Sequence, residues 1–321
     1  MKSNKPTVPR KTTLPAGPRP WLYAAAVCIT LLAVFEAYQP ALHGPFLFDD
    51  LYLPFQLPEL IHAPLSHWLR QTRPFLMFTF WVNLRVFGLD PYYFHLFNVL
   101  FHFANGVLVY LIAKRLLCKV GVEGWTLALY SGFAAGVFLF HPLQTESVAY
   151  VASRSETLSV LFFYAAFVLF LYRREAAASW RVAATVVFLF AGAALTKEHT
   201  AVFPALLLLT DYYWNPGFSF GGIKRNWRLY LPLVAAGAAG LAFVWTVLRA
   251  ADTAGFAVAG LPWHDYLYTQ GRAIWVYLRM FVLPAGLNLD HDFAISRSPL
   301  DHGAVIGLAA LAALAAAAFW L

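Results

Sequence analysis

Long apolar runs recur along the chain, and short polar stretches separate them. A helix needs about 20 apolar residues to cross a bilayer. We expect helices at residues 21–38, 92–113, 125–140, 157–172, 182–195, 201–213, 230–248 and 303–321. The runs at 125–140, 182–195 and 201–213 are short for a span, so we expect each to extend into its neighbours or to be shielded by other helices. This pattern predicts an all-α polytopic membrane protein.

One further stretch, residues 272–285, fits two descriptions. It is apolar but short, and it carries Arg272 and Arg279 on one helical face. Such a helix can span the membrane or lie in the outer interface. The sequence leaves both possibilities open.

Basic residues collect at alternate ends of the expected spans, beginning before the first one. The first 19 residues hold no acid and five basic side chains, Lys2, Lys5, Arg10, Lys11 and Arg19. The positive-inside rule places this segment in the cytoplasm and the loop after the first span outside. We therefore expect a disordered basic cytoplasmic tail at residues 1–20 and one transmembrane domain at residues 21–321.

The composition excludes an ordinary soluble protein. Hydrophobic residues make up 60% of the chain and charged residues only 12%, against about 45–50% and 25% in soluble domains. The net charge of +7 is first an orientation signal in a membrane protein, so we expect no nucleic-acid partner. The two cysteines, Cys28 and Cys118, predict neither a disulfide nor a metal site.

Two adjacent carboxylates, Asp49 and Asp50, stand among aromatic residues in the first outer loop. A low dielectric and mutual repulsion would raise the pKa of one of them. That property suits a general base that takes a proton from a hydroxyl. A helix cap or a solvated turn is the alternative, and the couplet alone does not decide between them.

A polar stripe runs along the second expected span. His95, Asn98, His102 and Asn105 share one helical face because their spacings are 3, 4 and 3. Polar groups at membrane depth face the bundle interior or a wet cavity, and not lipid. Interhelical hydrogen bonding is the alternative role, and it fits the asparagines best. His95 lies nearest the outer surface, so it is the member that we expect to touch a substrate.

Further charged residues lie at the outer ends of the later helices. An outward-facing Arg154 could bind a phosphate with two hydrogen bonds. Lys197 could also hold a phosphate, with Glu198 orienting it, and Arg73 is a weaker third cation. The alternative is a set of local surface pairs, such as Arg154 with Glu146, which contribute little to stability.

Five motifs, taken together and in this order, resemble one known family. They are FLFDD at 46–50, Arg73-Pro74 with FTFWVN at 78–83, GLDPYYFHLFNVLFH at 88–102, HPLQTESVAYVASRSETL at 141–158 and LTKEHTAVFP at 195–204. A weaker match covers residues 269–293. The chain resembles the membrane half of the transmembrane-and-TPR-containing O-mannosyltransferases, members of the GT-C glycosyltransferase superfamily, over residues 40–300.

The resemblance implies a GT-C-like helical bundle whose long first outer loop carries juxtamembrane helices. It implies that an acceptor hydroxyl attacks C1 of a sugar carried on a polyprenyl phosphate, with inversion and with Asp49 or Asp50 as the base, Asp49 being preferred. The leaving phosphate needs cations, not a general acid. The candidates for this role are Arg154, Lys197 and Arg73, and the supporting residues are His95, His141, Glu146 and Glu198.

The resemblance also sets expectations about cofactor, partners and location. A divalent metal at the acid couplet is one possibility, which His141 or Glu146 could complete. The expected partners are a polyprenyl-phosphate-linked sugar, an acceptor protein or peptide, and the lipid bilayer. A TPR region is expected beyond Leu321, and the Ala-rich spans indicate a bacterial cytoplasmic membrane with the active site on the periplasmic side.

Two other functions remain open at this point. One is a transporter or flippase of lipid-linked sugar, which would use the same phosphate site but need no base. The other is a non-catalytic membrane scaffold for a C-terminal TPR domain. The sequence does not name the sugar or the acceptor.

Overall fold

The computed structural model describes residues 17–173, 177–215, 218–250, 261–288, 291 and 293–320, so most of the expected basic tail lies outside the described residues. Within these ranges the chain forms helices and no strand. Four helical segments are long and apolar enough to cross a membrane, namely α1 (Pro20–Leu42), α5 (Pro91–Lys119), α8 (Arg154–Leu171) and Asp301–Ala318, which contains most of α14 (Ala304–Trp320). The expected all-α polytopic membrane protein is confirmed.

The remaining expected helices are also present, and several are longer than their apolar runs. α6 (Gly124–Phe140) bends by 48° into the segment Pro142–Ala149, which includes α7 (Thr145–Ala149), and such a pair is a broken span or a re-entrant loop. The others are α9 (Trp180–Ala194), η4 (Glu198–Val202) with α10 (Phe203–Trp214), α11 (Gly221–Arg225) and α12 (Trp227–Ala250). The ambiguous stretch at 272–285 is the second half of α13 (Trp263–Val282) and the turn after it.

The loop between α1 and α5 carries helices, as expected. It contains η1 (Phe48–Tyr52), η2 (Pro54–Gln56), α2 (Pro58–Ile61), α3 (Leu65–Trp68) and α4 (Pro74–Phe87). Proline stands at the start of η2, α2 and α4, where its missing N–H leaves no helical bond unmade. The aromatic side chains of Phe55, Phe80 and Phe94 pack together beneath this loop and attach it to α5.

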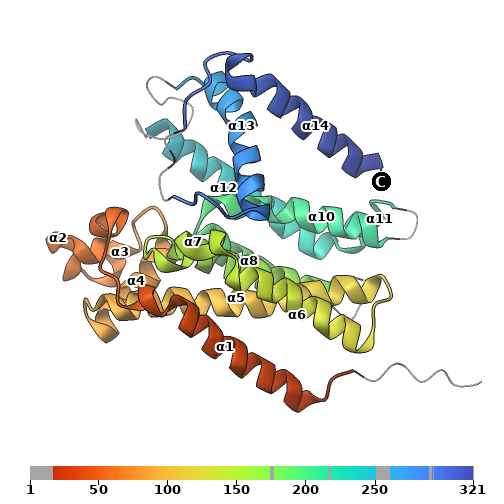
Figure 1. Cartoon of the computed structure of the whole chain (residues 1–321), viewed down its shortest axis with the longest axis horizontal. Helices are drawn as coiled ribbons and strands as arrows, with labels where there is room; N and C mark the ends of the chain where they lie inside the picture. The colour runs from red at the N-terminus through yellow and green to blue at the C-terminus, as the bar shows by residue number, and fades with distance from the viewer. Residues whose placement is uncertain are drawn as a thin grey trace, which may run out of the picture.

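The long helix α5 is the centre of the bundle. It packs against α1, α6 and α8, and in Figure 1 these helices lie side by side below α13 and α14. Close packing with α6 depends on Gly106, because a Cβ at this position would lie only 2.5 Å from the Leu139 side chain. The helical hairpin of α13 and α14 is held by Trp275, whose indole N–H donates to the Gly307 carbonyl at 3.0 Å.

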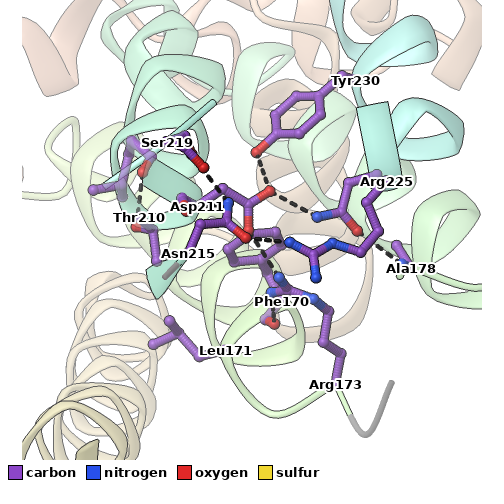
Figure 2. A network of polar contacts seen from close by, with 12 residues as sticks. Phe170, Leu171, Arg173, Ala178, Thr210, Asp211, Asn215, Ser219, Arg225 and Tyr230 are labelled. Carbon is purple, nitrogen blue, oxygen red and sulfur yellow. Dashed lines mark hydrogen bonds and ion pairs between the residues drawn. The ribbon is translucent and has the colours of Figure 1, made fainter. Parts of the chain in front are cut away.

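A buried polar network surrounds Asp211 of α10, next to the C-terminal end of α8 (Figure 2). The Asp211 carboxylate accepts hydrogen bonds from Arg173 at 2.8 Å, from Asn226 at 2.7 Å and from the Tyr230 hydroxyl at 2.8 Å. Arg225 donates to Asn215, which itself donates to the Asp211 carbonyl at 2.6 Å. These bonds join the end of α8 to α10, α11 and α12, so the network is a structural tie between four helices.

Candidate functional site

A cavity of about 710 Å³ lies between the first loop and the α13 hairpin. Its first wall comes from residues 45–50, its second from residues 142–150, and its third from α13 together with Leu287, Asn288, His291 and Phe293. The volume lies within the range of small-ligand sites, and most of the lining is apolar with a few polar groups, as is usual for such sites. Of the expected site residues, Asp50, His95 and Glu146 line this cavity.

Asp50 anchors the first loop to the start of α8. Its side chain is buried, with only 1% exposed. One carboxylate oxygen accepts from the Ala152 N–H at 2.7 Å and the other from the Leu47 N–H at 3.1 Å. Burial raises the pKa of Asp50, and these backbone donors oppose the rise. Both oxygens therefore already have partners, which leaves Asp50 poorly placed to take a proton from a bound hydroxyl.

Unlike Asp50, Asp49 has an exposed side chain. Its backbone N–H donates to the Tyr150 hydroxyl at 2.7 Å. Burial, with the added charge of Asp49 and Asp50, raises the pKa of Tyr150 to about 12. The preceding residue, Phe48, has a φ of 45°, in the left-handed region that residues with a side chain rarely adopt. Backbone strain of this kind is often found at functional sites.

The polar stripe of α5 faces the protein interior, as expected, and all four of its side chains are buried. Asn98 donates to the Tyr150 carbonyl at 2.9 Å and Asn105 to the Thr157 carbonyl at 2.8 Å. His102 lies 3.0 Å from the Leu139 carbonyl, and its ring packs against Tyr38 and Phe138. His95 is the one member of the stripe in the cavity wall, and its Nε2 lies 3.2 Å from the Gly44 carbonyl.

The expected outward position of Arg154 is wrong, because its side chain is 0% exposed. The guanidinium donates to the Asn98 amide oxygen at 3.1 Å, the Asn83 amide oxygen at 2.8 Å and the Phe94 carbonyl at 2.9 Å. It also lies 4.4 Å from the centre of the Phe80 ring. The first loop and α4 cover the outer end of α8, so Arg154 joins α4, α5 and α8 and does not line the cavity.

The other expected cations form a separate cluster of surface ion pairs. Arg73 pairs with both Glu198 oxygens at 2.7 and 3.3 Å, and Lys197 pairs with Glu156. Burial alone raises the pKa of Glu198, but hydrogen bonding and charge from Arg73 outweigh it and lower this pKa below its ordinary value. Glu156 comes four residues after Ala152, the partner of Asp50, so this cluster and the anchor of the acid couplet are close in the sequence.

His141 ties the bent span to α13. Its Nε2 donates to the Phe281 carbonyl at 2.8 Å, its Nδ1 accepts from the Leu143 N–H at 3.2 Å, and the ring stacks on Phe281. Both ring nitrogens are engaged, so His141 does not fit the expected role of a metal ligand. Within the described ranges no three His, Cys, Asp or Glu residues come together as a metal site would require.

Sequence reasoning missed several polar residues of the cavity wall, among them Tyr150, Gln270 and Asn288. Tyr150 stands within one of the motifs that carry the family resemblance, so its position was the available signal. Gln270 and Asn288 lie more than 200 residues after the couplet that they face. No local pattern in the sequence predicts a contact between residues that are so far apart in the chain.

The chain is similar to several curated proteins with one common description. It is 30% identical to protein O-mannosyl-transferase TMTC3 of Homo sapiens over 149 residues, which are 46% of this chain and 15% of that protein. It is 28% identical to protein O-mannosyl-transferase TMTC1 of Mus musculus over 177 residues, 50% of this chain and 17% of that one. The chain is a relative of the TMTC proteins. The expected resemblance is confirmed.

A longer stretch of the chain is similar to protein O-mannosyl-transferase F38B6.6 of Caenorhabditis elegans. The two are 25% identical over 228 residues, which are 68% of this chain and 30% of that TMTC protein. The chain therefore spans less than a third of each of these three relatives. No family model matches the sequence, and no solved structure matches the fold.

Proposed function

We propose that this TMTC relative is a membrane glycosyltransferase that moves a sugar from a polyprenyl-phosphate donor to a hydroxyl of a protein. Two findings support the proposal. The named relatives are protein O-mannosyl-transferases. Asp50 of the first loop is anchored in the wall of a ligand-sized cavity, and the residue before it, Asp49, has an exposed side chain.

The reaction proceeds in one displacement. Asp49 takes the proton of the acceptor hydroxyl as its oxygen attacks C1 of the sugar. The bond from C1 to the phosphate oxygen breaks, and its electron pair leaves with the phosphate. Attack from the face opposite the phosphate inverts the anomeric centre, as in single-displacement glycoside hydrolysis. Asp49 is the better base of the two because Asp50 already accepts two backbone hydrogen bonds.

The leaving phosphate is stabilised by Lys197 and Arg73, and not by direct contact with Arg154. Both cations are partly exposed and are paired with glutamates, which a phosphate can replace as the charged partner. Arg154 contributes from a distance, since its buried positive charge interacts with the Asp50 carboxylate. Glu198 and Glu156 hold the two cations in position until the donor arrives.

The supporting residues have different roles in this scheme. Glu146 is exposed in the cavity wall and faces the acceptor. His95 orients the loop through Gly44, and His141 attaches α13 to the rest of the site. No step requires a metal.

We place the reaction on the outer face of the membrane, which is the periplasmic face in a bacterial cytoplasmic membrane. The support is the charge pattern of the spans. Lys114, Arg115 and Lys119 lie at the far end of α5 from the acid couplet, and basic residues mark the cytoplasmic side. The named relatives are protein O-mannosyl-transferases, so the proposed acceptor is a protein.

The observation that carries the proposal is the exposed Asp49 beside an anchored Asp50 at the cavity wall. The purified chain, in nanodiscs, is incubated with polyprenyl phosphates bearing different hexoses and with Ser- and Thr-containing peptides. We expect mass spectrometry to find a peptide carrying one hexose. Movement of the lipid-linked sugar across a vesicle membrane without any peptide product would contradict a transferase and identify a flippase.

A further inference from the structure

The cavity wall that faces the acid couplet has a different chemistry. It is formed by α13 residues and by a short segment after α13, including Gln270, Ala273, Val276, Tyr277 and Asn288. Among the described residues of this wall there is no carboxylate, ammonium or guanidinium. Apart from His291, none of these described residues can offer a positive charge to a phosphate. The wall suits a ligand part that is neutral but rich in hydrogen-bonding groups.

Two amide side chains, Gln270 and Asn288, supply the hydrogen bonds of this wall. An amide offers both donors and acceptors, so it can bind a hydroxyl in either role. Within the described part of the chain, the Gln270 side chain has no hydrogen-bond partner, although it is half-buried. Its hydrogen-bonding groups are therefore available to a ligand in the cavity. Ala273 and Val276 lie beside it and can pack against the C–H face of a sugar ring.

Contacts behind the wall hold it in place. The Thr269 hydroxyl donates to the Asp265 carbonyl at 2.7 Å and accepts from the Ser296 N–H at 2.9 Å. Arg272 donates to the Ser296 hydroxyl at 2.7 Å and to the Ala294 carbonyl at 3.0 Å. These bonds lie directly before and after Gln270 in α13. A binding group supported in this way can select between ligands that differ in one hydroxyl.

We infer that Gln270, with Asn288, binds the ring hydroxyls of the transferred sugar and determines which hexose this protein accepts. The inference rests on the proposed function, because it takes the cavity as the site of the donor sugar. In this arrangement C1 points toward the acid couplet, and the remaining hydroxyls point toward α13. A hexose that lacks a hydroxyl in the bonded orientation leaves the half-buried Gln270 amide unpaired, which weakens its binding in the transition state.

The test compares donor sugars that differ in configuration at one or two ring carbons. Transfer from the polyprenyl phosphates of mannose, glucose and galactose to one peptide is measured for the wild type, Gln270→Leu and Asn288→Leu. Gln39→Leu is the matched control, because Gln39 is exposed on α1 and does not line the cavity. Thermal unfolding confirms that each variant is folded.

We expect Gln270→Leu to lower kcat/KM for the preferred sugar and to reduce its preference over the epimers at least about 10-fold. The control keeps the wild-type preference. Transfer by the wild type with the same preference in both cavity variants overturns this inference alone. Absence of transfer by the wild type with every donor overturns the proposed function, and this inference with it.

Discussion

The Tyr150 hydroxyl accepts a hydrogen bond of 2.7 Å from the backbone N–H of Asp49, although 101 residues separate the two. Asp50 makes a parallel contact with the Ala152 N–H. The segment between α7 and α8 therefore fixes the backbone of Asp49 and the side chain of Asp50. This relationship explains how a carboxylate on an exposed loop keeps one position relative to the cavity.

Tyr150→Phe should lower kcat at least about 10-fold while the protein stays folded. The substitution keeps the ring but removes the acceptor of the Asp49 N–H. The two acids keep their charge, but the position of the Asp49 backbone is no longer fixed. Steady-state kinetics distinguish a positioning role from a role in donor binding, because loss of positioning lowers kcat more than it raises the donor KM. Tyr52→Phe is the control, because Tyr52 lies in the same loop with 78% of its surface exposed. An unchanged kcat in Tyr150→Phe would remove Tyr150 from the mechanism.

Asp50 should give the folding stability a distinct pH dependence. Burial raises the pKa of Asp50 above its usual 3.8, so the folded chain holds this proton more tightly than the unfolded chain. The free energy of unfolding therefore decreases as pH rises from the usual pKa through the raised one, and stays lower above it. Asp50→Asn removes the titrating group. The Tm of the wild type minus that of Asp50→Asn should decrease as pH rises across this window.

The matched control for this measurement is Glu59→Gln, which removes an exposed carboxylate from the same loop. Its Tm should stay close to that of the wild type throughout the window. A difference between wild type and Asp50→Asn that is constant with pH would show that Asp50 titrates alike in the folded and unfolded chains.

Arg154→Met should destabilise the protein by about 1–3 kcal/mol, the usual effect of leaving a buried hydrogen-bond acceptor without its donor. The Asn83 and Asn98 amide oxygens and the Phe94 carbonyl would lose their donor. Arg70→Met, at an exposed arginine, should change the Tm little. If Arg154→Met unfolds at the wild-type temperature and only raises the donor KM, Arg154 binds phosphate and the buried position is not maintained in the active protein.

Gly222→Ala should loosen the Asp211 network and destabilise the protein by about 1–3 kcal/mol, as overpacking does. A Cβ at this position would collide with the Asn215 amide and lie 3.1 Å from the Asp211 side chain. Gly237→Ala in α12 is the control, since nothing lies within 4 Å of its added Cβ. Differential scanning fluorimetry in detergent measures both. Equal Tm values for the two variants would mean that the network tolerates the methyl group.

Much of this fold could be predicted from the sequence because each bilayer span leaves a local mark. Apolar length located the helices, and the spacing of His95, Asn98, His102 and Asn105 correctly gave the face of α5 that is buried. The exact ends were less predictable. α13 begins nine residues before the expected stretch, because its first half alternates polar and aromatic residues and does not form an apolar run.

The site was less accessible to sequence reasoning, because its geometry depends on long-range packing. Arg154 follows an outer turn, so it looks exposed when only its neighbours in the chain are considered. The aromatic cluster that contains Phe55 and Phe80 packs over Arg154, so the Arg154 side chain is buried and connects the helices around it. Gln270 stands in the weaker family match at 269–293, but its place in the cavity becomes visible only when α13 is brought opposite the first loop.

The central claim is that Asp49 acts as the base in sugar transfer from the cavity. The most direct measurement is the initial rate of hexose transfer to a peptide by Asp49→Asn, compared with the wild type in the same nanodiscs. An amide of nearly equal volume cannot take the acceptor proton, so the rate should fall by about 10²–10⁴, the usual contribution of a general base, with the Tm unchanged. Transfer at the wild-type rate by folded Asp49→Asn would contradict the claim.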